Sequence, residues 1–321
     1  MNLRIGFHVS ISGGISKSVD NALKDNCTAF QIFSRNPRGW AAKPLDDEDV
    51  QLFKNKVMGK IVGTGTVKSK NVTVAKNSAQ AIRRNKDYRI DSNAIFVHMP
   101  YLPNLSSPNT KIYDQSVEVL IDELGRCEKL DISYLVVHLG SHQGEGIKKG
   151  VEQLVYACSQ AIDKSSSKNK VSLLLENSAG QKNAVASIFG ELGLILDKLY
   201  EHNPRSNKDR FNVCLDTCHA FASGYDLTSE DAVYDTLDKF KQEIGVRHLK
   251  LIHLNDSKDK ILSRRDRHEH VGLGEIGENG FKAFVKHKSL RNIPLIMETP
   301  LDNRRKNSDN LMFVKAMIDR D

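Results

Sequence analysis

Phe211-Asn212-Val213-Cys214-Leu215-Asp216 is a short, mostly apolar run that ends in a carboxylate, and this arrangement recurs along the chain. Leu173-Leu174-Leu175 is followed in the same way by Glu176, and Leu135-Val136-Val137 by His138. A nearly continuous apolar run of this length is typical of a parallel strand that is covered on both faces. Side chains suited to chemistry therefore follow strands directly, as they do in a barrel whose strand ends converge on one face.

Eight such strands can be marked in the sequence, with helical patterns between them. Repeated β-α units predict a parallel sheet, and eight of them predict a closed barrel. We therefore expect an α/β fold, a (β/α)8 TIM barrel that forms a single domain over residues 1–321. The predicted strands cover residues 4–9, 28–33, 94–98, 134–139, 171–176, 211–216, 249–254 and 294–298.

The helical patterns consist of apolar residues spaced three and four apart, which places each set on one face of a helix. An acidic run before a further apolar pattern supplies a helix N-cap and acids in the first turn. The two apolar stripes are Val117, Leu120, Ile121 and Leu124, and Val233, Leu237, Phe240 and Ile244, and the acidic run is Asp46-Asp47-Glu48.

Composition and charge limit the class of protein and its partners. The chain has 321 residues, of which 39% are hydrophobic and 27% charged, which is ordinary for a globular protein. Its five cysteines form no CxxC pair, so we expect reduced, buried thiols and no disulfide. No apolar run approaches the roughly 18 residues of a membrane helix, and the N-terminus lacks a signal-peptide pattern. We predict an intracellular (cytoplasmic) protein without a membrane partner, and the net charge of +7 suits a polyanion.

An insertion is predicted before the third strand. Later strands begin 37 to 45 residues apart, whereas the second and third begin 66 residues apart. Residues 57–93 contain eight Lys and Arg against two Asp, a charge of +6 that is nearly that of the whole chain. This basic segment is either a solvated, flexible loop without a task or an arm that contacts phosphates, and the sequence leaves both interpretations open.

Nine side chains of the metal-ligand type are expected at the downstream ends of the strands. Any single His there is more often a hydrogen-bonded structural residue, and an Asp is often the N-cap of the next helix. Nine together are enough for more than one ion, and two neighbouring ions can stabilise both oxygens of a phosphodiester cleavage. The residues are His98, His138, Glu176, Asp216, His219, His253, Asp266, His268 and Glu298. The close spacing of Asp216 with His219, and of Asp266 with His268, predicts that each pair leaves one short turn.

Six motifs, in order, resemble the signature of the endonuclease IV family of apurinic/apyrimidinic (AP) endonucleases. The resemblance extends from about residue 5 to residue 318, interrupted by the insertion. The motifs are Gly-Phe-His-Val-Ser-Ile-Ser-Gly-Gly (6–14), Leu-Glu-Asn-Ser-Ala-Gly-Gln (175–181), Cys-Leu-Asp-Thr-Cys-His-Ala-Phe-Ala-Ser-Gly-Tyr-Asp (214–226), His-Leu-Asn-Asp-Ser-Lys (253–258), Asp-Arg-His-Glu-His-Val-Gly-Leu-Gly-Glu-Ile-Gly (266–277) and Pro-Leu-Ile-Met-Glu-Thr (294–299).

The resemblance implies a monomeric barrel with three zinc ions, in part replaceable by manganese, that cleaves double-stranded DNA on the 5′ side of abasic sites. It also implies trimming of blocked 3′ ends, with Glu176 and Glu298 as the catalytic carboxylates. Carried over motif by motif, it assigns the ligands as follows. His98, His138 and Glu176 hold the first zinc; Glu176, Asp216, His253 and Glu298 the second; and His219, Asp266 and His268 the third.

The resemblance also implies DNA contacts. In Asn-Pro-Arg-Gly-Trp (36–40), Arg38 occupies the place of an Arg that enters the gap left by the missing base. Tyr101 and Leu102 match residues that wedge into the duplex, which costs less where a base is already lost. For Tyr101 and Trp40 the alternative is packing under a loop. The chain departs from the family pattern at three positions, Leu139, Leu273 and Pro37, and none of them is a predicted ligand.

Two other functions use the same residues. A metal-dependent sugar isomerase or epimerase of the xylose-isomerase-like type also has Glu, Asp and His at barrel strand ends, but it needs only one or two ions. A non-catalytic DNA-binding barrel would leave a set of buried carboxylates unused, which is costly unless they are paired. Strand cleavage at an abasic site distinguishes the endonuclease from both.

Overall fold

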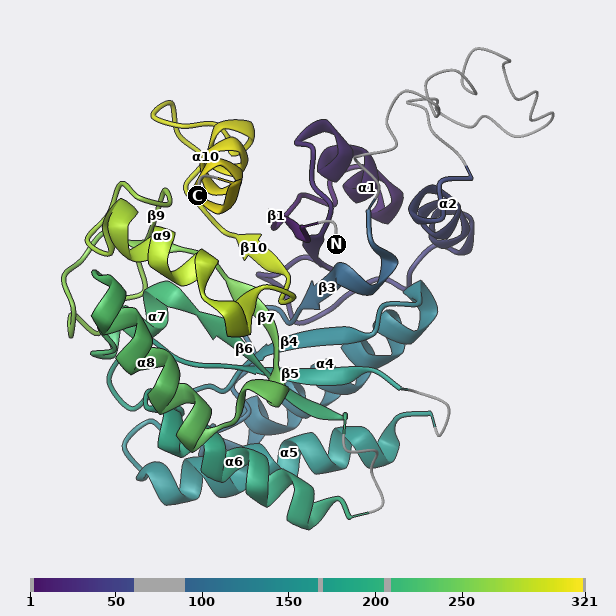
Figure 1. Cartoon of the computed structure of the whole chain (residues 1–321). Helices are drawn as coiled ribbons and strands as arrows, with labels where there is room; N and C mark the ends of the chain where they lie inside the picture. Colours follow the sequence, from purple (N-terminus) through teal and green to yellow (C-terminus); the bar gives the residue numbers. More distant parts are fainter. Residues whose placement is uncertain (1–2, 61–89, 167–169, 205–208, 320–321) are drawn as a thin grey trace.

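The computed structural model describes residues 3–60, 90–166, 170–204 and 209–319. Eight parallel strands form one sheet in the order β1-β10-β7-β6-β5-β4-β3-β2, and helices surround it (Figure 1). Each strand agrees with its predicted position to within two residues at either end. The strands are β1 Ile5–Phe7, β2 Phe30–Phe33, β3 Ile95–His98, β4 Tyr134–His138, β5 Ser172–Glu176, β6 Phe211–Asp216, β7 Leu249–His253 and β10 Leu295–Met297.

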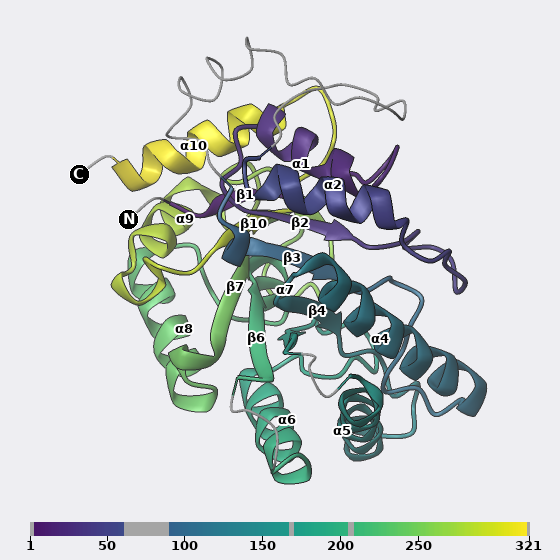
Figure 2. The same cartoon turned by 90° about the vertical axis from the view of Figure 1, so that its right-hand side faces the viewer.

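The two ends of this strand order, β1 and β2, are joined by backbone hydrogen bonds. The Val9 amide donates to the Gln31 carbonyl over 2.8 Å, and the Ala29 amide donates to the Ile5 carbonyl over 3.2 Å. Gly6 permits this approach, because a Cβ there would lie 1.8 Å from the Ala29 carbonyl oxygen. The sheet is therefore a nearly closed barrel with its helices outside (Figure 2), and the predicted (β/α)8 fold is confirmed.

The helices form where the sequence patterns predict them. Val117, Leu120 and Leu124 are buried on one face of α4, and Val233 and Phe240 on one face of α8. The helices are α1 Ile15–Lys24, α2 Asp47–Val57, α4 Thr110–Leu130, α5 Ile147–Lys164, α6 Phe189–His202, α7 Thr217–Ala222, α8 Glu230–Glu243, α9 Gly277–Lys286 and α10 Asn307–Asp319, with short 3-10 turns at Ser92–Ala94, Val246–His248 and Lys288–Leu290. The side chain of Asp46 accepts a hydrogen bond from the Asp49 amide and so caps α2, as predicted.

The apolar residues form two layers, because successive side chains of a strand point to opposite faces. The outer layer fills the space between strands and helices. The inner layer fills the barrel itself and consists of Ala29, Ala94, Phe96, Val136, Leu174, Cys214, Leu251 and Ile296. Above this plug, toward the carboxyl ends of the strands, the interior side chains become polar and charged.

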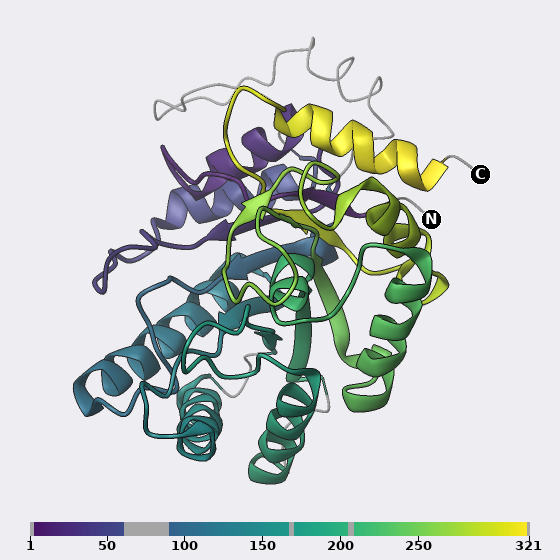
Figure 3. The same cartoon turned by 90° about the vertical axis from the view of Figure 1, so that its left-hand side faces the viewer.

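One element was not predicted from the sequence. The connection from β7 to α9 contains two short antiparallel strands, β8 Asp256–Ser257 and β9 His268–Glu269. Figure 3 shows this yellow-green connection folded across the end of the barrel where the strands terminate. Strands of two residues have no hydrophobic period, so the sequence pattern contains no signal for them.

Residues 61–89, the greater part of the predicted insertion 57–93, lie outside the described residues, so both interpretations of that segment stay predictions. The assignment of residues 1–321 to one domain also stays a prediction. All five cysteines are buried and free, as expected. Among the described residues, no helix is both long and apolar enough to cross a bilayer.

Candidate metal centre

Six of the nine predicted ligand residues lie where barrel strands end. The strand ends place them around the mouth of the barrel, directly above the apolar plug. They are His98 on β3, His138 on β4, Glu176 on β5, Asp216 on β6, His253 on β7 and Glu298 directly after β10.

The other three residues reach the same place from outside the barrel sheet. His219 lies in α7, less than one turn after Asp216. Asp266 and His268 lie on the connection after β7, where His268 pairs with Ser257 in the β8-β9 ribbon. Asp216 and His219 therefore leave one short turn, as predicted. The expected short turn is wrong for Asp266 and His268, because backbone pairing in the ribbon bends this connection back over the barrel.

Glu176 lies at the centre of the cluster and is 2% exposed. Its Oε2 lies 3.3 Å from Nε2 of His98 and 3.2 Å from Nε2 of His138. Its Oε1 lies 3.0 Å from Nδ1 of His253. The two oxygens of one carboxylate thus face separate histidines, which is the arrangement that a bridging ligand requires.

A second group of donor atoms lies around His253. Its Nδ1 is 3.5 Å from Oε2 of Glu298 and 3.9 Å from Oδ2 of Asp216, in addition to its contact with Glu176. His253 and Asp216 are fully buried. Three carboxylates therefore converge on one imidazole nitrogen, and the negative charge gathered there favours a cation.

A third group consists of His219, Asp266 and His268. Nε2 of His219 and Nε2 of His268 each lie 3.1 Å from Oδ1 of Asp266. Both nitrogens are buried, and neither has a hydrogen-bond partner. Buried polar atoms are nearly always satisfied, so two orphaned nitrogens aimed at one carboxylate indicate that a further group belongs between them.

Backbone carbonyls fix the orientation of three of the imidazole rings. Nδ1 of His98, of His219 and of His268 each donates to a carbonyl, which can only accept. A hydrogen is therefore on Nδ1, and in the neutral ring the lone pair of Nε2 points into the cluster, as hydrogen-bond partners of metal-binding histidines arrange it. The acceptors are the carbonyls of Met99 at 2.6 Å, Asn177 at 2.9 Å and Glu298 at 3.2 Å, respectively.

The charged groups shift the pKa values of one another. Burial lowers the pKa of His268, but Asp216 and Asp266 outweigh it and raise that pKa to about 9. The same two carboxylates raise the pKa of His219 well above its ordinary value, against the effect of burial. Burial raises the pKa of Asp266, but the two histidines hold it below its usual range. The carboxylates thus favour positive charge at His219 and His268, and a metal ion that displaces their protons would supply that charge instead.

The donor set suits divalent metal ions. Imidazole nitrogen and carboxylate oxygen are the ligands that catalytic zinc sites use. Within each of three groups, the donor atoms lie within 4.8 Å of one another: His98, His138 and Glu176; Glu176, Asp216 and His253; and His219, Asp266 and His268. A fourth group combines Asp216 and His268 with Cys218. Burial raises the pKa of the Cys218 thiol, which disfavours the thiolate needed for metal binding.

Asn177 and Asn255, which were not predicted as site residues, form hydrogen bonds to the candidate ligands. The Asn177 side chain accepts from the Asp216 amide over 2.8 Å and donates to the Asp216 carbonyl over 3.1 Å. The Asn255 amide group donates to Oδ2 of Asp216 over 2.7 Å and accepts from the Glu298 amide over 2.7 Å. Both residues lie inside the family-like motifs at 175–181 and 253–258, so the motifs themselves were the available signal.

Asp256, another missed residue, organises the segment that follows the ribbon. Its buried carboxylate accepts hydrogen bonds from five backbone amides, those of Ser257, Gly272, Gly274, Ile276 and Gly277. Gly274 is required here, because a Cβ would lie 2.3 Å from the Ser257 carbonyl oxygen and 2.6 Å from Oδ1 of Asp256. The glycines of the 266–277 motif therefore wrap one carboxylate and fix the ribbon that carries His268.

The predicted DNA contacts lie on the rim of this centre. Arg38 is exposed, and the Tyr101 and Leu102 residues are 57% and 40% exposed. The Tyr101 ring packs edge-on against Phe33 at 5.1 Å, and its amide donates to the Pro37 carbonyl over 3.2 Å. Burial, together with nearby carboxylates, raises the pKa of Tyr101 to about 12. The segments after β2 and β3 are thus tied together beside the cluster, whereas Trp40 packs partly against the core.

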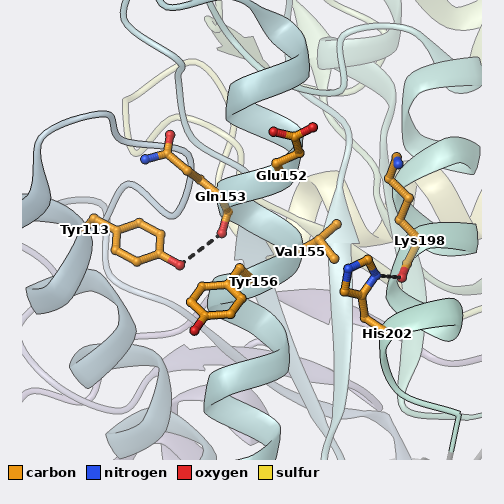
Figure 4. Close-up of a pocket in the computed structure, with 7 residues that line it drawn as sticks. All are labelled: Tyr113, Glu152, Gln153, Val155, Tyr156, Lys198 and His202. Atoms are coloured by element: carbon orange, nitrogen blue, oxygen red, sulfur yellow. Dashed lines mark hydrogen bonds between the residues drawn. The ribbon is translucent and has the colours of Figure 1, made fainter.

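Two cavities differ in their position and in the residues that line them. One of about 230 Å³ opens beside the cluster between Tyr101, His268, Glu298 and Leu301. Another, of about 400 Å³, lies outside the barrel among α4, α5 and α6 (Figure 4). In the second, the Tyr113 hydroxyl donates to the Gln153 carbonyl and His202 Nδ1 donates to the Lys198 carbonyl. The inner cavity is the candidate substrate site, because it is lined by the candidate ligands His268 and Glu298, whereas the outer cavity lies outside the barrel. Its lining is Phe7, His8, Phe33, Tyr101, His268, Met297, Glu298, Thr299, Leu301 and Asn307.

Comparisons with known proteins agree with this geometry. A family model described as a xylose isomerase-like TIM barrel matches residues 19–317. "Probable endonuclease 4" of Cenarchaeum symbiosum is 45% identical over 98% of this chain and 99% of its own length. The crystal structure of endonuclease IV from Thermus thermophilus superposes with a TM-score of 0.76, at 29% identity over 98% of both chains. A D-tagatose 3-epimerase-like protein reaches a TM-score of 0.59 at 16% identity, over 98% of this chain and 96% of its own, and at that identity it shows the fold alone.

Proposed function

The chain belongs to the endonuclease IV family and is a nuclease of AP-endonuclease type, and on that basis we propose that it hydrolyses the phosphodiester 5′ to abasic sites in double-stranded DNA with the help of zinc. The products are a 3′-hydroxyl and a 5′-deoxyribose phosphate. We include trimming of blocked 3′ ends, because that reaction breaks the same kind of bond at the same centre.

One observation carries the proposal. Nε2 of His219 and Nε2 of His268 are buried, lack hydrogen bonds and point at Asp266. A sugar isomerase or epimerase that uses one or two ions would leave this third group without a task. Three groups suit a reaction in which negative charge develops on several phosphate oxygens at once.

The residues divide into three sets by position. His98, His138 and Glu176 would hold one ion; Glu176, Asp216, His253 and Glu298 a second; and His219, Asp266 and His268 a third. Zinc, or manganese in part, supplies Lewis acidity there: it lowers the pKa of a water to about 7 and neutralises developing charge. Glu176 would serve both of the first two positions, since its two oxygens face different histidines, and Glu298 would complete the second.

Residues of the rim would select the substrate. Tyr101 lines the inner cavity, Leu102 follows it in the chain and is 40% exposed, and Arg38 lies on the neighbouring segment. Their insertion beside a missing base costs less unstacking than insertion into intact duplex. Arg265 and Arg267 flank Asp266. Both are ion-paired with Asp259, but their side chains are 67% and 55% exposed, so phosphates can still reach them.

The test is a cleavage assay on a duplex with one tetrahydrofuran abasic analogue, combined with metal analysis of the purified protein. We expect one cut directly 5′ to the lesion, about three zinc atoms per chain, and loss of cleavage after treatment with a strong chelator. The undamaged duplex of the same sequence is the control. Sugar epimerisation without strand cleavage, or cleavage unaffected by proven metal removal, would contradict the proposal.

A further inference from the structure

Gln31 is fully buried on β2, and it is not one of the predicted site residues. Its side-chain amide reaches three groups at the mouth of the barrel. Nε2 lies 2.7 Å from Oε1 of Glu298 and 2.9 Å from Nδ1 of His8, and Oε1 lies 2.9 Å from Nε2 of His253. Both ends of one amide are therefore engaged by the side chains around the second metal position.

The orientation of this amide follows from its neighbours. An ionised carboxylate only accepts hydrogen bonds, so the Gln31 group that lies 2.7 Å from Glu298 must be the NH₂. The carbonyl oxygen of Gln31 then faces His253. Because that oxygen can only accept, Nε2 of His253 must carry a ring hydrogen, so in the neutral ring the lone pair is on Nδ1.

The lone pair of His253 points at the centre of the cluster. Nδ1 faces Oε1 of Glu176 at 3.0 Å and Oε2 of Glu298 at 3.5 Å. His98, His219 and His268 are oriented in the opposite sense, with the hydrogen on Nδ1 and Nε2 turned inward. In those three rings a backbone carbonyl accepts the hydrogen, whereas in His253 a side chain accepts it.

We propose that Gln31 is a positioning residue that fixes the ring orientation of His253, and through it the affinity of the Glu176–Asp216–His253–Glu298 position for its ion. The inference rests on the proposed function. Without Gln31 the hydrogen of His253 is free to move to Nδ1, where it competes directly with a metal ion. The second hydrogen bond from Gln31 also holds Glu298 in place, so two ligands of one position depend on a single amide.

The test compares wild type with Gln31→Met, which keeps the side-chain volume and removes both hydrogen-bonding groups. Metal-free protein is titrated with zinc in competition with a chromophoric chelator, which resolves the ions by affinity. Loss of an outer partner of a ligand typically weakens metal binding by about 10- to 100-fold. We expect that loss for one ion of Gln31→Met and wild-type affinity for the others.

A matched control separates positioning from general loss of stability. Asn212 is also a buried barrel amide, 2% exposed, but it donates to Oγ of Ser172 and to the Asp209 carbonyl where β6 begins, at the opposite end from the cluster. Asn212→Leu should lower the melting temperature and leave the affinity for every ion unchanged. If Gln31→Met does not accumulate as folded protein, Gln31→Ala removes the same groups with less bulk and takes its place.

A second readout tests the ring directly. In cadmium-loaded protein with ¹⁵N-labelled histidine, wild type should show one ring, His253, bound through Nδ1 and hydrogen-bearing at Nε2, with coupling to ¹¹³Cd. The Gln31 variant should lose that signal first as cadmium is removed. Wild-type zinc affinities together with an unchanged His253 signal would overturn the inference and leave the proposed function standing. A wild-type protein that binds no zinc would overturn both.

Discussion

At the scale of single residues, Glu176 has the most consequential position, because its two oxygens face histidines of different groups. Glu176→Gln keeps the shape of the side chain and replaces one ligand oxygen by an NH₂ that cannot bind a metal ion. We expect kcat on abasic DNA to fall by at least about 100-fold, the scale on which loss of one electrostatic stabiliser acts. Affinity for the same DNA should change little, because Glu176 lies below the rim. Single-turnover cleavage and fluorescence anisotropy measure the two quantities.

A conservative change far from the centre provides the comparison for that experiment. Glu152 is exposed on α5, beside the outer cavity. Glu152→Gln should cleave like wild type. Cleavage by Glu176→Gln within about tenfold of wild type would mean that a bridging carboxylate is not needed.

Substitution of Tyr101 tests whether the residues at the rim distinguish abasic DNA from intact DNA. Its ring is held edge-on by Phe33, and more than half of the residue is exposed. Tyr101→Ala should weaken binding to abasic duplex by about 1–3 kcal/mol, the typical contribution of one aromatic stacked on a base, and should weaken binding to intact duplex less. Tyr156, 60% exposed on α5, gives the matched control, since Tyr156→Ala removes a similar ring away from the site. Equal losses on both duplexes would exclude a role in selection.

The residue types of the cluster could be predicted from sequence, but their orientations could not. A His or Glu after an apolar run can be recognised from the local sequence. The order of the six motifs then supports the assignment of these residues to one site. The contact between Gln31 and His253 joins residues 222 positions apart. No spacing rule connects such residues, and the direction of an imidazole depends on that contact. The role of each predicted ligand and of Arg38, Tyr101 and Leu102 stays a prediction until metal and DNA binding are measured.

At the scale of elements, α4 anchors the segment that carries Arg38. Within this helix, Glu123 is fully buried and accepts from Nε of Arg35 over 2.7 Å and from Oγ of Ser34 over 2.6 Å. Arg35 also donates to the Trp40 carbonyl, and Arg126 donates to the Ser34 carbonyl. Burial raises the pKa of Glu123, and these donors oppose that shift. A buried ion pair thus fastens the start and end of the 34–40 segment to one helix.

Breaking this pair should have a large effect on stability. Glu123→Leu leaves the Arg35 guanidinium, whose side chain is 4% exposed, with the half-exposed Asp122 in place of a buried carboxylate partner. We expect the free energy of unfolding to fall by about 3–5 kcal/mol, as is typical when one partner of a buried pair is removed. Urea unfolding of the metal-free protein measures it.

The control for Glu123 is an exposed ion pair of the same kind. Glu145 and Lys149 lie 2.8 Å apart, and each side chain is about half exposed. Glu145→Leu should leave the urea midpoint where it is, because surface pairs contribute little. If Glu123→Leu behaves the same way, the buried pair does not anchor the segment.

The elements themselves divide into predictable and unpredictable ones. Strands and amphipathic helices have a period that apolar residues reveal, so β1 to β7, β10 and helices such as α4 were found. The β8-β9 ribbon depends instead on backbone pairing and on the five amides that surround Asp256. Such a structure is specified by one carboxylate and several glycines, which leave no periodic pattern.

At the scale of the whole molecule, we expect metal to contribute strongly to stability. The three donor groups join β3 to β7 with the β8-β9 ribbon, and Glu298 adds the segment after β10 through its contact with His253, so ions held there would connect most of the barrel mouth. A ligand present at about 1,000 times its Kd stabilises a fold by about 4 kcal/mol per site. Removal of all ions should therefore lower the melting temperature by about 10 °C or more.

Calorimetry with and without a strong chelator, at one pH and salt concentration, measures this difference. Zinc added back should restore the original melting temperature, whereas magnesium, which prefers oxygen ligands, should not. A melting temperature that does not respond to verified metal removal would be incompatible with three occupied positions.

The barrel as a whole could be predicted because each β-α unit repeats the same local pattern. Eight such units also predicted that the barrel closes, but not the contacts that close it, since β1 and β2 meet through a few backbone hydrogen bonds and the space that Gly6 leaves. The charge of residues 57–93 is plain from the sequence, but whether that charge contacts DNA depends on where the segment lies in space, and residues 61–89 are not described.

Asp216 connects the chemistry of the centre to the start of a helix. Its Oδ1 accepts from the His219 amide and caps α7, while its Oδ2 faces His253 and His268. One carboxylate thus fixes a helix end and a candidate ligand position together. Amide hydrogen exchange at His219 should consequently slow when metal ions bind at the centre. The exchange rate of this one backbone proton would then report metal occupancy in the absence of substrate.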